Sequence, residues 1–146
     1  MDELDARIIK VLQTDGRASN SHISREVGVS EGTVRRRLHH LVKDDVIKVV
    51  AIPNLDQMGY GTAALVGIRT HPASVEAIAD SLSDLEDIQY VSITTGAWDI
   101  FIWVRAQSTE ELGAFLRNQI AVIPGVMQTE TFINLFIKKR PYGMAM

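Results

Sequence analysis

Two short helical patterns separated by a three-residue break constrain the fold of this chain more than any other feature. Residues 20–42 read NSHISREVGVSEGTVRRRLHHLV, and the break is Gly28-Val29-Ser30. Apolar residues recur at helical spacing on both sides of it, so each helix has one face committed to a core. Gly28 can take the left-handed conformation that ends a helix, and Ser30 can accept a backbone N–H as the next N-cap. The pattern predicts a helix-turn-helix.

The second of these helices carries a concentration of basic side chains. From Arg17 to Lys43 the chain has six Lys or Arg residues and two Glu, although its net charge over 146 residues is −3. Phosphate binding needs such a local excess, because affinity comes mostly from cations that displace condensed counterions. The alternative is that the arginines form an ordinary solvated helix face. We favour a DNA-reading helix that presents its N-terminal, non-core positions to a major groove.

The expected DNA contacts fall into two groups. Arg36 is expected to read base edges, because Arg pairs bidentately with guanine and the small neighbours Gly32 and Thr33 let the helix approach. His40 is expected to follow the same groove, and the other cations are expected to bind intrahelical carboxylates or phosphates, the latter positioning the protein without reading sequence. Among them, Arg37 also falls near the buried side of the helix. The predicted DNA-binding set is Arg17, Ser30, Gly32, Thr33, Arg35, Arg36, Arg37, His40 and Lys43.

The segments on either side of this motif complete a first domain over residues 1–52. Asp2 and Asp5 resemble a carboxylate version of the capping box, and the apolar face that follows predicts a supporting helix ending at Asp15-Gly16. Residues 46–52, VIKVVAI, are rich in β-branched residues and predict a strand, which would make this domain a winged helix-turn-helix unit. Residues 53–61, PNLDQMGYG, have the composition of a linker or hinge.

From residue 62 onward the pattern is strand, helix, strand, strand, helix, strand. The expected strands are residues 62–70, 88–95, 99–106 and 126–139, and the expected helices begin near Val75 and after Ser108. This order is that of a ferredoxin-like βαββαβ domain over residues 62–146, with both helices on one face of the sheet. The fold class is therefore α+β: an N-terminal winged helix-turn-helix domain plus a C-terminal ferredoxin-like domain.

The expected strands carry apolar residues at both odd and even positions, for example Phe101 and Trp103 beside Ile100 and Ile102. A half-solvated antiparallel sheet would alternate. Because the helices cover only one face, we infer that the other meets a second copy in a homodimer; the alternative is a monomer with scattered surface apolar residues. A dimer would present two reading helices to a pseudo-palindromic DNA operator.

Composition excludes several other classes of function. The chain has no Cys, and its four His show no ligand spacing, so we expect no metal site. No apolar run approaches the roughly 20 residues of a membrane span, and the start, MDELDARIIK, is acidic where a signal peptide is basic. We expect a cytoplasmic protein without a membrane partner. We also expect no enzyme activity and no cofactor, since no acid–base pair, nucleophile constellation or phosphate loop is visible.

Three stretches together resemble the Lrp/AsnC family of feast/famine regulators. They are LDARIIKVLQTDGRASNSHISREVGVSEGTVRRRLHHLVKDDVIK, then TGAWDIFIWV, then IPGVMQTETFINLFIKK, in family order across nearly the whole chain. The resemblance implies a transcription regulator with a ferredoxin-like effector domain, and dimers that assemble further, often to octamers. It also implies a small-molecule effector, typically an amino acid, bound between dimers near a Gly-x-x-Asp turn and the last strand.

Carried onto this chain, the resemblance gives an effector set in which Asp99 is the partner of the ligand's ammonium group. The set is Thr95, Gly96, Ala97, Trp98, Asp99, Gln128, Thr129 and Thr131. The alternative is that the turn residues only shape a hairpin and the threonines only favour a strand. The chain departs from the family at Ala97-Trp98, where a small or polar residue and Tyr are usual, so a pocket here is expected to be narrower, more apolar or filled by Trp98. It also departs at Asp45, where Gly is usual.

Two other functions remain alternatives to an effector-responsive regulator. One is a ligand-independent architectural protein that compacts DNA with the same domains. The other is an enzyme similar to the sirohaem decarboxylases, which resemble this family in both domains. The latter needs basic and His residues around a tetrapyrrole, and the second half of the chain offers only Arg69, His71 and Arg105.

Overall fold

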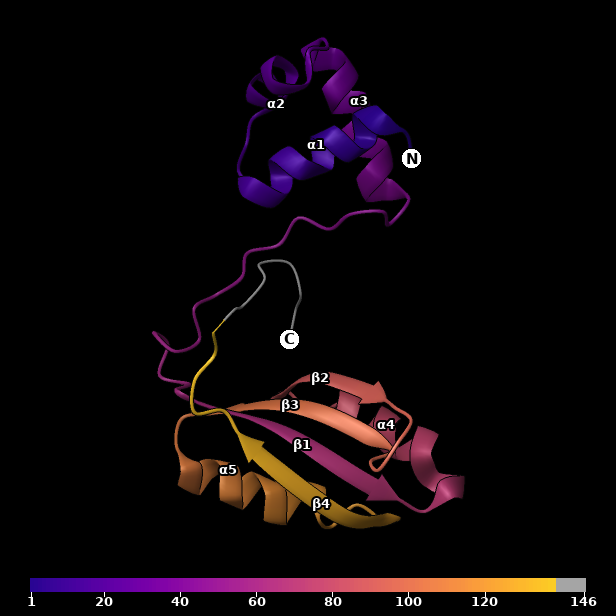
Figure 1. The fold of residues 1–146 in the computed structure, drawn as a ribbon, viewed down its shortest axis with the longest axis vertical. Coiled ribbons are helices and arrows are strands. Elements are labelled where there is room, and N and C mark those ends of the chain that lie inside the picture. The colour runs from indigo at the N-terminus through magenta and orange to yellow at the C-terminus, as the bar shows by residue number, and fades with distance from the viewer. Residues whose placement is uncertain (139–146) are drawn as a thin grey trace. The chain divides into compact units, whose positions relative to one another are not determined.

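The structure, a computed structural model, describes residues 1–138 and divides the chain into two compact units, residues 1–52 and residues 53–146 (Figure 1). The last residue of the expected final strand, Lys139, lies outside the described residues.

The first unit consists of three helices, α1 (Glu3–Thr14), α2 (Asn20–Val27) and α3 (Glu31–Lys43). Their apolar faces enclose a small core of buried residues: Ile8, Ile23, Val27, Val34 and Leu41. The local signals in the sequence act as predicted. Asp2 and Asp5 form a reciprocal capping box on α1, Gly28 ends α2 with a φ of 72°, and the Ser30 hydroxyl accepts the backbone N–H of Thr33 to begin α3. These caps place α2 and α3 in a helix-turn-helix.

The predicted strand over residues 46–52 is wrong, and with it the wing of the first unit. The segment forms no strand, and Val49, Val50 and Ile52 are each more than half exposed. A strand is stable only when its backbone N–H and C=O groups meet a neighbouring strand, and residues 1–52 contain none. The turn before the segment does form as expected, because Asp45 adopts a left-handed φ of 54°.

The second unit is an antiparallel four-stranded sheet with its strands in the order β2-β3-β1-β4. The strands are β1 (Thr62–Thr70), β2 (Ile88–Ile93), β3 (Ile100–Ala106) and β4 (Val126–Ile133). A 3-10 turn, η1 (Pro72–Ser74), leads into α4 (Val75–Ser83), and α5 (Thr109–Phe115) continues as a π-helical turn, η2 (Leu116–Ile120). The predicted βαββαβ order and the α+β class are confirmed.

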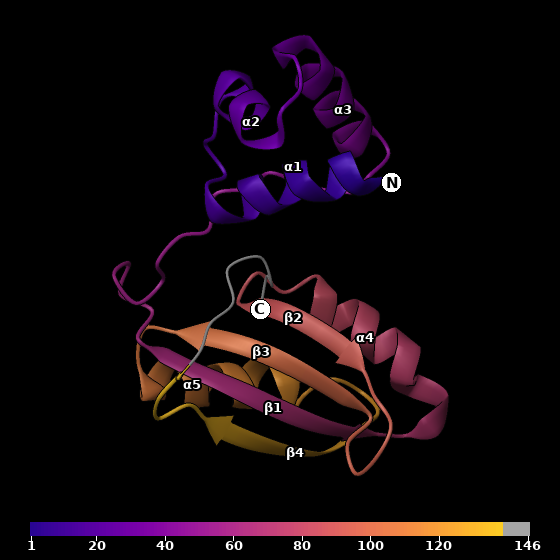
Figure 2. The same ribbon diagram turned by 45° about the horizontal axis from the view of Figure 1, so that its top comes forward.

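Both helices lie on one side of this sheet (Figure 2). On that side, buried residues of β1 and β3 pack against Ile78 and Leu82 of α4 and against Leu112 and Ile120 at the other helix. The opposite side, called here the open face, has no helix of the second unit's described residues on it. Its residues come from all four strands and include Leu65, Gly67, Tyr90, Phe101, Trp103 and Phe132. Apolar and aromatic side chains therefore line both sides of the sheet.

Residues 53–61, interpreted from the sequence as a linker, are held against the second unit by a buried arginine. Arg105 is 6% exposed, and its Nη1 donates to Asp56 Oδ1 at 2.6 Å and to the Tyr60 carbonyl at 3.0 Å. Backbone hydrogen bonds between Asn54 and Tyr60 close two successive turns in the same segment. The chain thus divides after Ile52.

Candidate functional site

Helix α3 presents most of the predicted DNA-contacting side chains on its exposed side. Arg35, Arg36, His40 and Lys43 are all exposed, whereas Val34 and Leu41 are fully buried on the opposite side. Helical periodicity explains this division, because residues three, four and seven apart share one face. The charged row is therefore fixed to face outward by the core residues of the same helix.

The first turn of α3 includes small residues and has open space at Gly32. A Cβ built on Gly32 meets no atom within 4 Å, so this position faces open space. Thr33 is half-buried, and its hydroxyl lies 2.9 Å from the Ser30 hydroxyl, which also caps the helix. Ser30 and Thr33 thus have structural roles at this end, while remaining at its surface. Arg17 is exposed in the turn between α1 and α2.

Arg37 differs from its two neighbours because its guanidinium is engaged within the protein. Its Nη1 lies 2.7 Å from Asp2 Oδ2 and 3.4 Å from Asp5 Oδ1, and Asp5 is 6% exposed. The backbone N–H of Asp5, together with the Arg37 guanidinium, holds the pKa of the Asp2 carboxyl below its ordinary value. Arg37 is therefore paired with two carboxylates at the start of α1, and its role in DNA binding stays a prediction.

A shallow cavity of about 320 Å³ lies beside α3 at the same place. It is lined mainly by Arg36, Arg37, His40 and Asp44 of α3 and its end, and by Met1 and Asp5 of the α1 side. Arg36 and Arg37 therefore border one hollow but have different partners, because only Arg37 forms ion pairs with α1 among the described residues.

The predicted effector turn follows β2 and is closed by its own backbone and side chains. Thr94 and Asp99 pair through the Thr94 N–H and the Asp99 carbonyl at 2.8 Å, and the Thr94 hydroxyl donates to the Trp98 carbonyl. Gly96 has a φ of 113°, a value that favours glycine. Asp99 Oδ2 accepts the backbone N–H of Thr70 at 2.8 Å. Asp99 therefore ties the turn to β1.

Trp98 lies against the open face of the sheet at a glycine. A Cβ on Gly67 would come within 2.8 Å of two Trp98 ring atoms, so the indole rests directly on the β1 backbone. Arg69, two residues along β1, lies 5.4 Å from the Trp98 ring centre. Its Nε and Nη2 donate to the Ala97 carbonyl at 3.2 and 2.9 Å. The side chain of Trp98 therefore lies between the turn and β1, where it contacts both Gly67 and Arg69.

Arg69 is the residue at this turn that sequence reasoning missed. It was noted only as a basic residue relevant to a tetrapyrrole, because 28 positions separate it from Ala97 along the chain. Only the pairing of β1 with β3 brings it to the turn. The available signal is Gly67, because a glycine inside a strand pattern marks a place where another group can approach the strand that also carries Arg69.

The strand residues of the predicted effector set lie on two different sides of the sheet. Gln128 pairs with Arg69 across β4 and β1, so it lies on the open face close to the turn. Thr129 and Thr131 pair with Ile68 and Val66, whose side chains are buried under the helices. Directly opposed residues of an antiparallel pair point to the same side. The structure therefore brings Gln128 to the turn and directs both threonines to the helix side of this edge strand.

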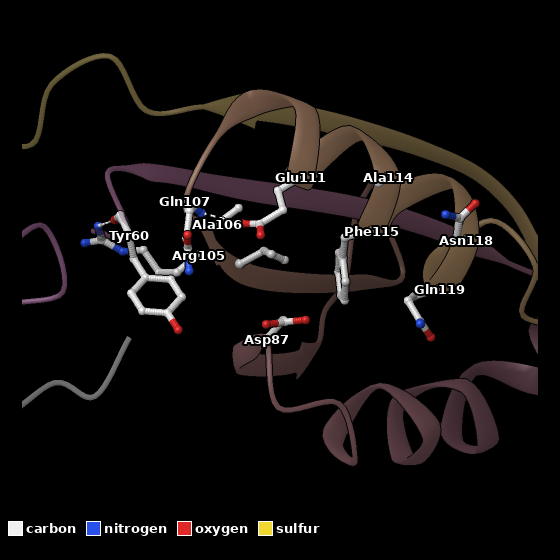
Figure 3. Close-up of a pocket in the computed structure, with 11 residues that line it drawn as sticks. Tyr60, Asp87, Arg105, Ala106, Gln107, Glu111, Ala114, Phe115, Asn118 and Gln119 are labelled. Atoms are coloured by element: carbon white, nitrogen blue, oxygen red, sulfur yellow. Dashed lines mark hydrogen bonds between the residues drawn. The ribbon is translucent and has the colours of Figure 1, made fainter. Parts of the chain in front are cut away.

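A second cavity, of about 340 Å³, lies on the helix side of the second unit. Figure 3 shows Glu111 and Phe115 pointing from their helix toward Asp87 across this cavity. Glu111 is engaged there, because its Oε2 accepts the backbone N–H of Gln107 at 2.8 Å. Asn118 and Gln119 of the π-helical turn complete the lining near the helix end.

Residues 1–138 lack the features of a metal site and of a membrane-spanning helix. No group of three or more His, Cys, Asp or Glu side chains in that range could hold a metal ion. None of the helices in that range has the length and apolar composition needed to cross a membrane.

Two family models match the chain and together leave few residues unassigned. The AsnC-type helix-turn-helix domain matches residues 1–42, and the Lrp/AsnC ligand binding domain matches residues 63–143. These matches fall on the two units that the structure separates. They assign DNA binding to the first unit and ligand binding to the second.

Relatives and solved structures agree with this division. An uncharacterised HTH-type transcriptional regulator of Pyrococcus furiosus is 40% identical over 144 residues, covering 98% of this chain and 97% of the relative. The solved structure of E. coli AsnC is 27% identical, with a TM-score of 0.89, and the match covers 96% of this chain and 95% of that one. A transcriptional regulator from Neisseria meningitidis, solved as a complex with L-Met, matches with a TM-score of 0.91 at 20% identity over 100% and 96% of the two chains, which shows the fold alone. This chain belongs to the Lrp/AsnC family of HTH-type transcriptional regulators.

Proposed function

We propose that this regulator reads specific DNA operators with α3 as a homodimer, and that an amino acid bound at the effector turn adjusts this activity. The observation that carries the proposal is the exposed row of Arg35, Arg36 and His40 beside the open position at Gly32. The major groove admits an α-helix, and the N-terminal residues of a recognition helix contact base edges there. Helix α3 offers exposed polar side chains and open space at that end.

The two arginines in this row have different proposed roles. Arg36 lies one turn after Gly32 and Thr33, so its guanidinium is placed to meet a guanine edge. Arg35 lies 100° around the helix from Arg36 and is placed to meet a phosphate, as is Lys43 at the helix end. The first contact selects a sequence, and the others contribute salt-dependent affinity to any DNA.

The homodimer is supported by the open face of the second unit. Phe132 is 45% exposed and Tyr90 is 38% exposed on this face, while the Trp103 indole Nε1 is buried there without a hydrogen-bond partner among the described residues. A second copy would cover the aromatic side chains and would pair two reading helices on a pseudo-palindromic site. We further propose that dimers assemble to octamers and that the protein acts in the cytoplasm.

An amino acid effector is supported by the charges around the turn. Arg69 is exposed and lies beside Ala97, so it offers a partner for a ligand carboxylate. The Asp99 carboxylate uses one oxygen for Thr70, and a carboxylate can accept several further donors, so it remains available to an ammonium group. Trp98 narrows the same place, which favours a ligand that binds at the edge of the turn.

The test is selection of bound sequences from random DNA, with and without a panel of amino acids. We expect enrichment of a pseudo-palindrome and a shift in affinity with at least one amino acid. A real coupling must appear by the same factor in the amino acid's own affinity when DNA is added. A regulator that enriches no sequence would refute sequence-specific binding, and one that binds no amino acid by calorimetry would leave the architectural function.

Two variants test the roles on α3. Arg36→Ala should weaken operator binding by about fivefold to a hundredfold and should blunt discrimination, because one base-edge pair is worth about 1–3 kcal/mol. Lys43→Ala should weaken operator and scrambled duplex equally. Equal losses on both duplexes for the two variants would contradict the assignment.

The tetrapyrrole alternative has little support among the described residues. Of its three candidate side chains, Arg105 is buried and bonds to Asp56, and His71 Nδ1 accepts the Ala73 N–H, which leaves the exposed Arg69. An absorbance titration with a porphyrin should therefore show no saturable change.

A further inference from the structure

The N-terminal helix holds one arginine of the reading helix through a three-way contact. Asp2 Oδ1 accepts the backbone N–H of Asp5 at 3.0 Å, and Asp5 Oδ2 accepts the backbone N–H of Asp2 at 2.9 Å. The remaining oxygen of Asp2 lies 2.7 Å from Arg37 Nη1, and Asp5 Oδ1 lies 3.4 Å from the same atom. Because the two carboxylates are fixed by backbone bonds to α1, they form a rigid receptor for the guanidinium.

The contact bears on the rotation of α3 about its own axis, which decides where Arg36 meets DNA. Val34 and Leu41 pack one side of α3 into the core, and Arg37 ties a second side to the beginning of α1. Successive residues of a helix are 100° apart, so the azimuth of Arg37 fixes that of Arg36 beside it. A rotation of α3 about its axis would move Arg36 sideways across the groove.

We propose that Arg37 is a positioning residue: core packing fixes which side of α3 faces outward, and the ion pair with Asp2 and Asp5 holds the finer rotation at which Arg36 meets DNA. This inference rests on the proposed function. Two carboxylates have an oxygen within 3.5 Å of Arg37 Nη1, so on this proposal Arg37 pairs with the start of α1 rather than with a phosphate. It acts on DNA only through the side chain next to it.

The substitution Asp2→Asn separates this role from phosphate binding, because the two roles predict opposite signs. Asparagine keeps an oxygen for the Asp5 N–H, so the helix cap survives, but it loses the charge that holds Arg37. If Arg37 positions α3, Asp2→Asn lowers operator affinity by at least about fivefold, the lower limit for one base-edge contact, and changes scrambled-duplex affinity little. If Arg37 were a phosphate ligand restrained by Asp2, the same change would free it and strengthen binding to both duplexes.

A second variant keeps the test decisive if the first is poorly folded. Arg37→Gln should lower operator affinity while the slope of log K against log salt stays unchanged; loss of a phosphate contact would reduce that slope by about 0.9. Arg7→Gln is the matched control, because Arg7 is a cation of α1 that donates to the Glu26 carbonyl rather than to α3. It should leave operator preference intact.

Binding is measured on full-length protein with a selected operator and a scrambled duplex at several salt concentrations, and thermal melting gives the folded fraction. Stronger binding of Asp2→Asn to both duplexes, a reduced slope for Arg37→Gln, or unchanged operator affinity in both variants would overturn the positioning role. Failure of the wild-type protein to prefer any operator would instead refute the proposed function.

Discussion

Replacing Gly67 with alanine is expected to displace the Trp98 indole and destabilise the second unit. The new Cβ would lie 2.8 Å from Trp98 Cγ and Cδ2 and 3.1 Å from Cδ1, which is closer than carbon atoms pack. These atoms belong to the inner part of the ring, so a small swing of the side chain does not relieve the contact. The Arg69 guanidinium and its bonds to the Ala97 carbonyl also hold the turn in place.

The size of the effect follows from two opposing contributions. Inserting a methyl group into a filled site costs about 1–3 kcal/mol. Replacing glycine within a strand returns roughly 0.5–1 kcal/mol, because glycine loses more backbone entropy on folding. The net loss should be about 0.5–2 kcal/mol, and each kcal/mol lowers the melting temperature of a unit of this size by about 4–8 °C.

A double-mutant cycle with Trp98→Ala should reverse the sign of the stability change. In a Trp98→Ala background no indole stands over position 67, so Gly67→Ala should raise stability by about 0.5–1 kcal/mol. Urea unfolding followed by circular dichroism at one fixed protein concentration gives all four corners of the cycle. An equal loss of stability from Gly67→Ala with and without the tryptophan would refute the packing that the structure shows.

Three further outcomes are expected. Ser30→Ala should cost about 1 kcal/mol by removing the N-cap of α3, whereas Ser30→Gly should cost only a few tenths, as urea unfolding will show. Because the folded protein lowers the pKa of Asp2, this carboxyl adds stability at pH values above 3.8, its ordinary pKa, and the contribution is lost as pH falls through the lower pKa of the folded state. In acid unfolding, the stabilities of Asp2→Asn and the wild type should therefore converge below that pH. Phe132→Lys should weaken the proposed dimer by about tenfold or more in sedimentation experiments, because an unpaired charge would be buried on the open face.

The sequence predicted what depends on neighbouring residues. The Asp2 and Asp5 capping box, the left-handed Gly28 and the Ser30 cap are all satisfied within a few positions of the chain, and all three form. The order of strands and helices followed from the change in apolar periodicity at residue 62 for the same reason. Local chemistry was sufficient to place each of these elements.

The sequence could not settle features that depend on distant partners. The β-rich segment at residues 46–52 has strand propensity but no strand beside it in its own unit. Strand alternation puts Gln128 on the opposite face from Thr129 and Thr131, but which of them faces the turn depends on the register of β4 on β1, which no short motif encodes. Helical spacing already put Arg37 nearer the buried side of α3 than Arg36, but its ion pairs with Asp2 and Asp5 depend on how α1 packs on α3.

The placement of the two tryptophans has a practical consequence. Trp98 and Trp103 both lie in the sheet unit, and residues 1–52 contain neither. Intrinsic fluorescence of the native chain therefore reports on the sheet alone, with no label attached. Measuring tryptophan emission while operator is titrated into the protein would show whether DNA binding at the helices changes the surroundings of Trp98 and Trp103, some sixty residues further along the polypeptide.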